Sequence, residues 1–176
     1  MKNALVLFGA LLTLALGADA QASPQGTKGT IATRTFLLGT WSCHHTVGTF
    51  SGDYATTWSL ALGNLWLKQT YDFPKSSEAP AIHAEYFMGY DERRQGWVRF
   101  GAHSNGQYFA IRMADDGKDG WYWKYVSFFP PRRPASTKPD AHFVRDSDRQ
   151  YEIFGPTYPL NGTGPVVTEH HICKKA

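Results

Sequence analysis

Short apolar runs separated by tight-turn residues are the sequence feature that most constrains this fold. From Gly39 onward, runs rich in aromatic and β-branched residues alternate with turn signals, as strands joined by short turns require. Gly63-Asn64 and Asn105-Gly106 each separate two such runs at the spacing of a β-hairpin. The sequence therefore predicts ten strands. They are expected at residues 40–48, 54–62, 64–73, 81–90, 96–103, 107–114, 120–129, 141–146, 150–155 and 165–174.

The length and the remaining pattern favour one all-β domain. A chain of 176 residues has room for a single domain, and the 15% of aromatic residues suits strands. Beyond residue 20 there is no long apolar stripe of helical period, and only Thr33–Leu38 looks like a helical turn. A meander of this length buries its edges best by closing on itself. We therefore expect a single closed or nearly closed antiparallel up-and-down barrel of about ten strands, after a short N-terminal helical turn.

The first twenty residues have the pattern of a secretory signal peptide. A thirteen-residue apolar run, Ala4–Leu16, follows a weakly positive start and precedes the small residues Ala18 and Ala20. The run is too short to span a bilayer, although an N-terminal anchor helix is the alternative reading. Cleavage is expected after Ala20, with Ala22 as a second site. The sequence thus predicts a signal peptide at 1–20, a flexible arm at 21–32 and a barrel at 33–176. After cleavage the protein is expected to be secreted or periplasmic, with no membrane span in the mature chain.

Cys43 and Cys173 are the only cysteines, and they lie near opposite ends of the expected barrel. An even cysteine count in an exported protein favours a disulfide, whereas the alternative is two buried free thiols. A bond between Cys43 and Cys173 would bring the first strand beside the last. For consecutive hairpins, that contact closes the barrel.

Three segments resemble calycins, the class that contains lipocalins, fatty-acid-binding proteins and nitrobindin-like barrels. Gly39-Thr40-Trp41 resembles the Gly-x-Trp opening of that class, in which a helical turn leads into the first strand and the tryptophan plugs the closed end. Gly63–Leu67, and Met88–Asp91 followed by Gly96–Val98, are similar to hairpins of uncharacterised bacterial calycin-like proteins. Nitrobindin-like proteins also carry a haem-binding histidine on their last strand, and His170 and His171 lie in the corresponding region here. The resemblance implies a β-barrel that binds a small molecule.

Two histidine doublets adjoin the two cysteines. Because strand side chains alternate between faces, His45 shares a face with Cys43, and His171 shares one with Cys173. If the cysteines are paired between antiparallel strands, His45 lies opposite His171. Trp41 has the same parity as Cys43, and the calycin tryptophan points inward, so we expect His45 and His171 inside the barrel. His44 and His170 are then expected outside.

The expected His45–His171 pair permits several chemistries. Neutral imidazoles can ligate haem iron or a transition metal, or act as acid and base. The structural alternative is a pair of core histidines that hydrogen-bond to each other and to Glu169. The pair is the candidate cofactor-binding site, with haem as the possible cofactor, while the sequence contains no metal-binding motif. Candidate ligand-contacting residues are the tryptophans expected to form the walls or plug: Trp41, Trp58, Trp66, Trp121 and Trp123.

The sequence favours an exported binding protein for a small hydrophobic or aromatic ligand. A net charge of +3 without a Lys/Arg stripe does not indicate nucleic-acid binding. No serine-nucleophile elbow, HExxH, phosphate loop or Cys-x-x-Cys is present, so an enzyme is the less favoured class. Two alternatives stay open. They are a haem-binding or histidine-dependent barrel enzyme, of isomerase, cyclase or peroxynitrite-handling type, and a non-catalytic envelope protein whose barrel is filled by its own side chains.

Overall fold

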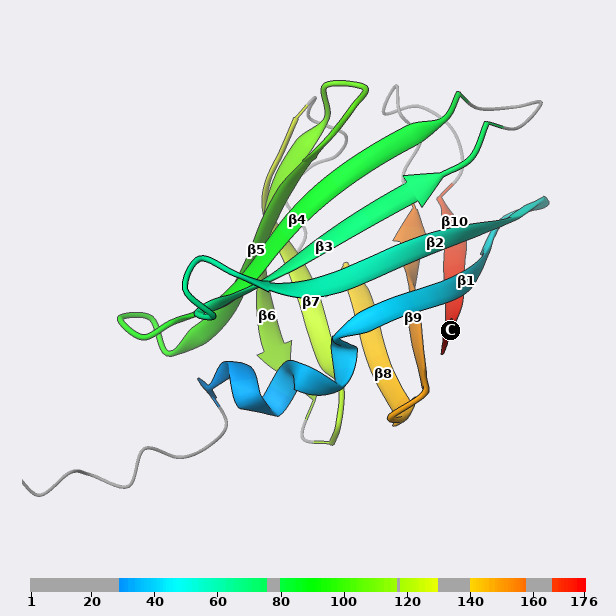
Figure 1. The fold of residues 1–176 in the computed structure, drawn as a ribbon. Coiled ribbons are helices and arrows are strands. Elements are labelled where there is room, and N and C mark those ends of the chain that lie inside the picture. The colour runs from blue at the N-terminus through cyan, green and yellow to red at the C-terminus, as the bar shows by residue number, and fades with distance from the viewer. Residues whose placement is uncertain (1–28, 76–79, 117, 130–139, 158–165) are drawn as a thin grey trace, which may run out of the picture.

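The computed structural model describes residues 29–75, 80–116, 118–129, 140–157 and 166–176. Ten antiparallel strands follow one 3₁₀ helix, η2 (Ile31–Leu37) (Figure 1). The predicted signal peptide lies outside the described residues. The strands are β1 (Gly39–Val47), β2 (Phe50–Ala61), β3 (Trp66–Phe73), β4 (Ile82–Asp91), β5 (Gly96–His103), β6 (Tyr108–Asp115), β7 (Trp121–Phe129), β8 (Ala141–Ser147), β9 (Gln150–Thr157) and β10 (Val167–Lys175).

The strands form a closed up-and-down barrel in chain order, sealed where β1 pairs with β10. This confirms the predicted fold class and strand number. The largest difference in strand bounds is at β2, which begins at Phe50 instead of residue 54. The polar and glycine-containing stretch Ser51-Gly52-Asp53 continues the pairing with β1, in which Gly52 lies opposite His45. The helix begins at Ile31, two residues before the predicted turn.

The disulfide between Cys43 and Cys173 joins the two ends of the barrel wall, as predicted. The two cysteines are direct partners in the β1–β10 register, and both are buried. The bond encloses a segment with a sequence separation of 130 residues. It therefore fixes the strand pair that closes the barrel.

One end of the barrel, where β1 begins, is filled by side chains. Helix η2 lies at this end (Figure 1), and its last residue, Leu37, is fully buried, as is Trp41 on β1. The Trp41 indole N–H donates a hydrogen bond of 2.6 Å to the Leu37 carbonyl oxygen. The ring of Trp121 stacks on that of Phe143 with centroids 3.8 Å apart. We call this the closed end.

The opposite end of the barrel is less densely filled. Several residues there are only partly buried, although they alternate in step with the buried residues of their strands and so point into the closed barrel. We call this the open end, and the partly buried inward residues are His45, Tyr71, Phe73, His103, Tyr125 and Glu169.

Among the residues that the structure describes, β7 and β8 form the shortest strand pairing in the barrel. Only Trp121, Tyr122 and Trp123 of β7 pair with described residues of β8. Nearer the open end, the Asp140 carboxylate accepts a hydrogen bond of 2.5 Å from the Tyr125 backbone N–H. The Asp140 backbone N–H also donates a hydrogen bond of 2.7 Å to the Trp123 carbonyl oxygen, so Asp140 binds β7 through both its backbone and its side chain.

Candidate functional site

His45 and His171 lie opposite each other inside the barrel, on the strands that the disulfide joins. They are direct register partners on β1 and β10. Their rings stack with centroids 4.2 Å apart and an interplanar angle of 18°. The placement follows from strand parity, since each histidine is two residues from a buried cysteine.

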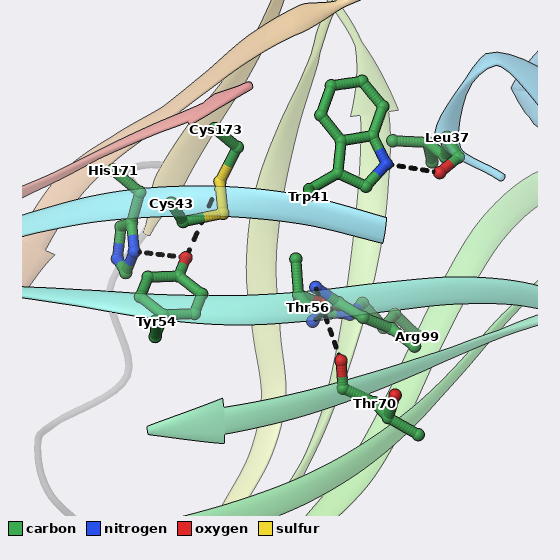
Figure 2. Close-up of a disulfide and its surroundings, with 10 residues drawn as sticks. Leu37, Trp41, Cys43, Tyr54, Thr56, Thr70, Arg99, His171 and Cys173 are labelled. Carbon is green, nitrogen blue, oxygen red and sulfur yellow. Dashed lines mark hydrogen bonds between the residues drawn. A yellow bond between two sulfur atoms is a disulfide. The ribbon is translucent and has the colours of Figure 1, made fainter. Parts of the chain in front are cut away.

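The two histidines differ in their hydrogen bonding. His171 Nδ1 is 2.8 Å from the Tyr54 hydroxyl, which also lies 3.8 Å from Cys173 Sγ (Figure 2). Both ring nitrogens of His45 are buried and have no hydrogen-bond partner. The His45 ring packs edge-on against the rings of Phe50 and Phe73 instead. His45 is therefore a polar group in apolar surroundings.

Burial keeps both imidazoles neutral at physiological pH. Desolvation, and then the neighbouring His44, lower the pKa of His45 to about 4. Desolvation, and then His45, His170 and Arg99, lower the pKa of His171 to about 3. A neutral imidazole has a lone pair on one nitrogen and can act as a hydrogen-bond acceptor or as a metal ligand.

A second polar cluster, which we call the Arg99 network, crosses the middle of the barrel. Arg99 Nη2 donates a 2.5 Å hydrogen bond to Gln69 Oε1, and Gln69 Nε2 donates one of 2.8 Å to Thr56 Oγ1. Thr56 in turn donates to the Thr70 carbonyl oxygen at 2.7 Å (Figure 2). Arg99, Gln69 and Thr56 are all buried.

The charge of Arg99 has no counter-ion among the described residues. Its Nε is buried without a hydrogen-bond partner, and its acceptor, Gln69, is neutral. Aromatic rings surround the guanidinium carbon, with centroids 4.2 Å away for Tyr86 and 4.8 Å for Trp123. Burial lowers the pKa of Arg99, and nearby tyrosines partly offset that effect.

Phenol groups line much of the same interior. The Tyr86 hydroxyl is 2.9 Å from His103 Nε2, and desolvation raises the pKa of Tyr86 to about 12. Burial also raises the pKa values of Tyr54, Tyr71, Tyr125 and Tyr151. These phenols stay protonated at neutral pH and present hydroxyl groups to the interior.

The five tryptophans predicted to contact a ligand occupy different environments. Trp41 and Trp121 belong to the packed closed end, and Trp58 is buried on β2. Trp123 lies beside Arg99, whose guanidinium carbon is 4.8 Å from the centroid of the indole ring. Trp66 is on the outer face, because it alternates with the buried Leu67 and Gln69 along β3, and its register partner Gly89 leaves room for the indole ring. Trp66 therefore cannot line the interior.

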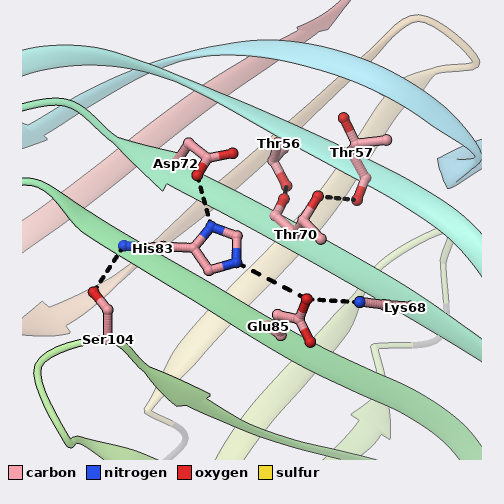
Figure 3. A network of polar contacts seen from close by, with 8 residues as sticks. All are labelled: Thr56, Thr57, Lys68, Thr70, Asp72, His83, Glu85 and Ser104. Carbon is pink, nitrogen blue, oxygen red and sulfur yellow. Dashed lines mark hydrogen bonds and ion pairs between the residues drawn. The ribbon is translucent and has the colours of Figure 1, made fainter.

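Four histidines lie on the outer face, each beside a carboxylate. His83 Nδ1 is 2.7 Å from Asp72, and its backbone N–H donates to Ser104 Oγ (Figure 3). The Glu85 carboxylate lies 2.6 Å from Lys68 Nζ in the same network. His44 pairs with Asp53 and His170 with Glu152, both at 2.7 Å. His142 lies 2.8 Å from Asp116.

The sequence predicts the histidine pair and places Arg99 on a strand, where an inward arginine would need a charged partner, but it does not predict the Arg99 network. Parity places Arg99 with Trp97, and Gln69 with Leu67 and Tyr71, so each was a polar residue on an apolar face. That signal could have marked both as interior residues. It could not have shown that they meet, because β3 and β5 are not adjacent strands.

Comparisons with known proteins identify no family. No protein-family model matches the chain, and no curated protein does. Among solved structures, a redesigned β-barrel matches with 10% identity and a TM-score of 0.40, over 84% of this chain and 97% of that one. The resemblance to calycins therefore stays a prediction, while the closed barrel itself is shown. Among the residues that the structure describes, no helix is long and apolar enough to cross a membrane.

Proposed function

We propose that this protein is an exported barrel that binds a small, largely apolar molecule bearing an anionic group inside its open half. The observation that carries the proposal is Arg99, a buried cation with an unpaired Nε and no counter-ion in the described residues. A buried, unpaired charge is costly, so proteins normally pair it. A bound anion would remove that cost.

The surroundings of Arg99 suit a molecule with an aromatic or apolar body. Tyr86 and Trp123 flank the guanidinium, and the partly buried rings of Tyr71 and Tyr125 lie toward the open end. Small-molecule sites combine mostly apolar walls with a few placed polar groups.

Two features support export. The disulfide fits an oxidising compartment, and the first twenty residues have the signal-peptide pattern. The alternative is a barrel whose interior is filled by its own side chains. The packing of the closed end supports this alternative, but only for that half of the barrel. No described feature specifically favours an enzyme.

The test uses two fluorescent probes with the same ring system. 1-Anilinonaphthalene-8-sulfonate is an anion, and N-phenyl-1-naphthylamine is its neutral counterpart. We expect saturable binding of both, with the anion bound more tightly. Arg99→Met should weaken binding of the anion about 10–100-fold, the range of a charge-assisted hydrogen bond, and leave the neutral probe unchanged.

Arg112→Met is the matched control, because Arg112 is an exposed arginine on the neighbouring strand β6. It should change neither affinity. Near-ultraviolet circular dichroism should verify that every variant keeps its packed core. Absence of saturable binding of either probe would favour the filled barrel, and equal loss of anion affinity in both variants would refute a specific role for Arg99.

A further inference from the structure

Three side chains with metal-ligating atoms converge at the open end. Glu169 and His171 share one face of β10, and His45 lies opposite His171 on β1. One ligand atom from each residue lies within 4.8 Å of the other two. This is the only group of three His, Cys, Asp or Glu side chains with that geometry in the part of the chain that the structure describes.

The unpartnered nitrogens of His45 are the second observation. Neither ring nitrogen has a hydrogen bond, although both are buried. Buried polar atoms nearly always have a hydrogen-bond partner, and an unsatisfied one destabilises the folded protein. A metal ion bound at either nitrogen would satisfy it, and His45 can turn toward an ion without breaking a hydrogen bond.

His171 already has the arrangement of a metal-ligating histidine. Its Nδ1 is hydrogen-bonded to the Tyr54 hydroxyl at 2.8 Å, which leaves Nε2 available. Ligating histidines usually make such a bond with their second nitrogen, which fixes the ring orientation and the tautomer. The disulfide two residues away on both strands holds His45 and His171 in register.

We propose that His45, Glu169 and His171 bind one divalent transition-metal ion of the Zn²⁺ class, with a fourth coordination position facing the barrel interior. Two imidazole nitrogens and one carboxylate oxygen are a known ligand set for zinc with an open position. The stacked rings of His45 and His171 must change relative orientation for both nitrogens to reach one ion. This inference goes beyond the proposed ligand-binding function and does not depend on Arg99.

The set favours a free metal ion over haem. Two axial haem ligands bind on opposite faces of the porphyrin, whereas the rings of His45 and His171 stack directly against each other with centroids 4.2 Å apart. Glu169 adds a negative charge that compensates a divalent cation. The carboxylate thereby distinguishes this site from a bare histidine pair.

The experiment titrates the full mature chain, stripped with EDTA, with Zn²⁺ in calorimetry and with Co²⁺ in visible absorption. We expect one ion per chain and the intense d–d bands of four-coordinate Co²⁺. His45→Phe and Glu169→Gln should each weaken Zn²⁺ binding at least about 100-fold, because each removes a direct ligand. Phenylalanine suits position 45, since Phe50 and Phe73 already surround it.

His44→Gln and His170→Gln are the matched controls, because these histidines lie one residue away on the outer face beside Asp53 and Glu152. Both should keep the wild-type affinity and the Co²⁺ spectrum. Arg99→Met should also keep them, which separates this test from that of the proposed function. If Zn²⁺ binds equally to wild type, His45→Phe and Glu169→Gln, or if the outer-face variants lose binding instead, the site is refuted. Should His45→Phe fail to fold, Glu169→Gln decides.

Discussion

His45 and His171 stack face to face across the strand pair that closes the barrel, with ring centroids 4.2 Å apart. Each histidine is two residues from a cysteine of the disulfide. The strand pair that closes the barrel therefore also carries the neutral imidazoles and two of the three candidate metal ligands. Perturbing any one of them should therefore affect the others in a measurable way.

The histidine pair should make stability depend on pH. The folded-state pKa values, about 4 for His45 and about 3 for His171, lie below the unfolded value of 6.5. The unfolded chain therefore binds more protons below pH 6.5. Stability from these groups is complete above that pH and is lost as the pH falls toward 4 and then 3. The slope is up to about 1.4 kcal/mol per pH unit for each group.

Urea unfolding between pH 6.5 and pH 5, in the presence of EDTA, measures this dependence before most carboxylates titrate. His45→Phe should flatten the slope, whereas His44→Gln should leave it as in wild type. An identical slope in all three proteins would contradict the assignment of the titration to the buried pair.

Removal of the disulfide should destabilise the barrel strongly. Cys43→Ser combined with Cys173→Ser opens a closed segment with a sequence separation of 130 residues. Loss of a native disulfide typically costs about 2–5 kcal/mol, and loop entropy places long segments at the upper end. Denaturant unfolding of the double variant should show this loss, and reduced wild type should match the variant. A double variant as stable as oxidised wild type would show that the strand pairing alone closes the barrel.

The Arg99 network should respond asymmetrically to substitution. Arg99→Met removes an uncompensated buried charge and should be neutral or stabilising in the absence of ligand. Gln69→Leu removes the acceptor at 2.5 Å and leaves the guanidinium with one fewer partner, at an expected cost of about 1.5–3 kcal/mol. Thermal unfolding of the two variants at one pH compares them directly. A larger loss for Arg99→Met than for Gln69→Leu would mean that the charge is already compensated in the free protein.

Trp41 should contribute to stability through its hydrogen bond as well as its packing. Trp41→Phe deletes the 2.6 Å bond to the Leu37 carbonyl and leaves a buried acceptor unpaired, at a cost of about 1–3 kcal/mol plus the lost contacts. Trp66→Phe, on the outer face over Gly89, should cost less. Equilibrium unfolding of the two variants gives the comparison, and a reversed order would contradict the closed-end plug.

Export with cleavage predicts the mass of the mature chain. Expressed with its own N-terminus in a secreting bacterial host, the protein should lose residues 1–20 and begin at Gln21, with Ala22 as the alternative cleavage point. Intact-mass spectrometry of the periplasmic fraction reads this directly. An uncleaved chain held in the membrane fraction would instead indicate an N-terminal anchor.

Much of the fold could be predicted because its signals are local. Alternation along each run and turn residues such as Asn105-Gly106 define the strands without reference to distant contacts. The structure agrees closely in the positions of β5, β7 and β10. The start of β2 was missed, since Ser51-Gly52-Asp53 has the composition of a turn yet pairs along β1.

Only the histidine pair of the candidate site could be predicted from the sequence, because the disulfide links two strands that are far apart in the chain. Once Cys43 and Cys173 are paired, a period of two residues places His45 opposite His171, so the sequence alone determined that relationship. The tertiary structure decided the rest. Barrel curvature brings Arg99 of β5 to Gln69 of β3 across the interior, and it gathers the rings of Tyr86 and Trp123 around the guanidinium. Such contacts depend on three-dimensional distance between non-adjacent strands and on local volume, and neither is encoded in the spacing of residues along one strand.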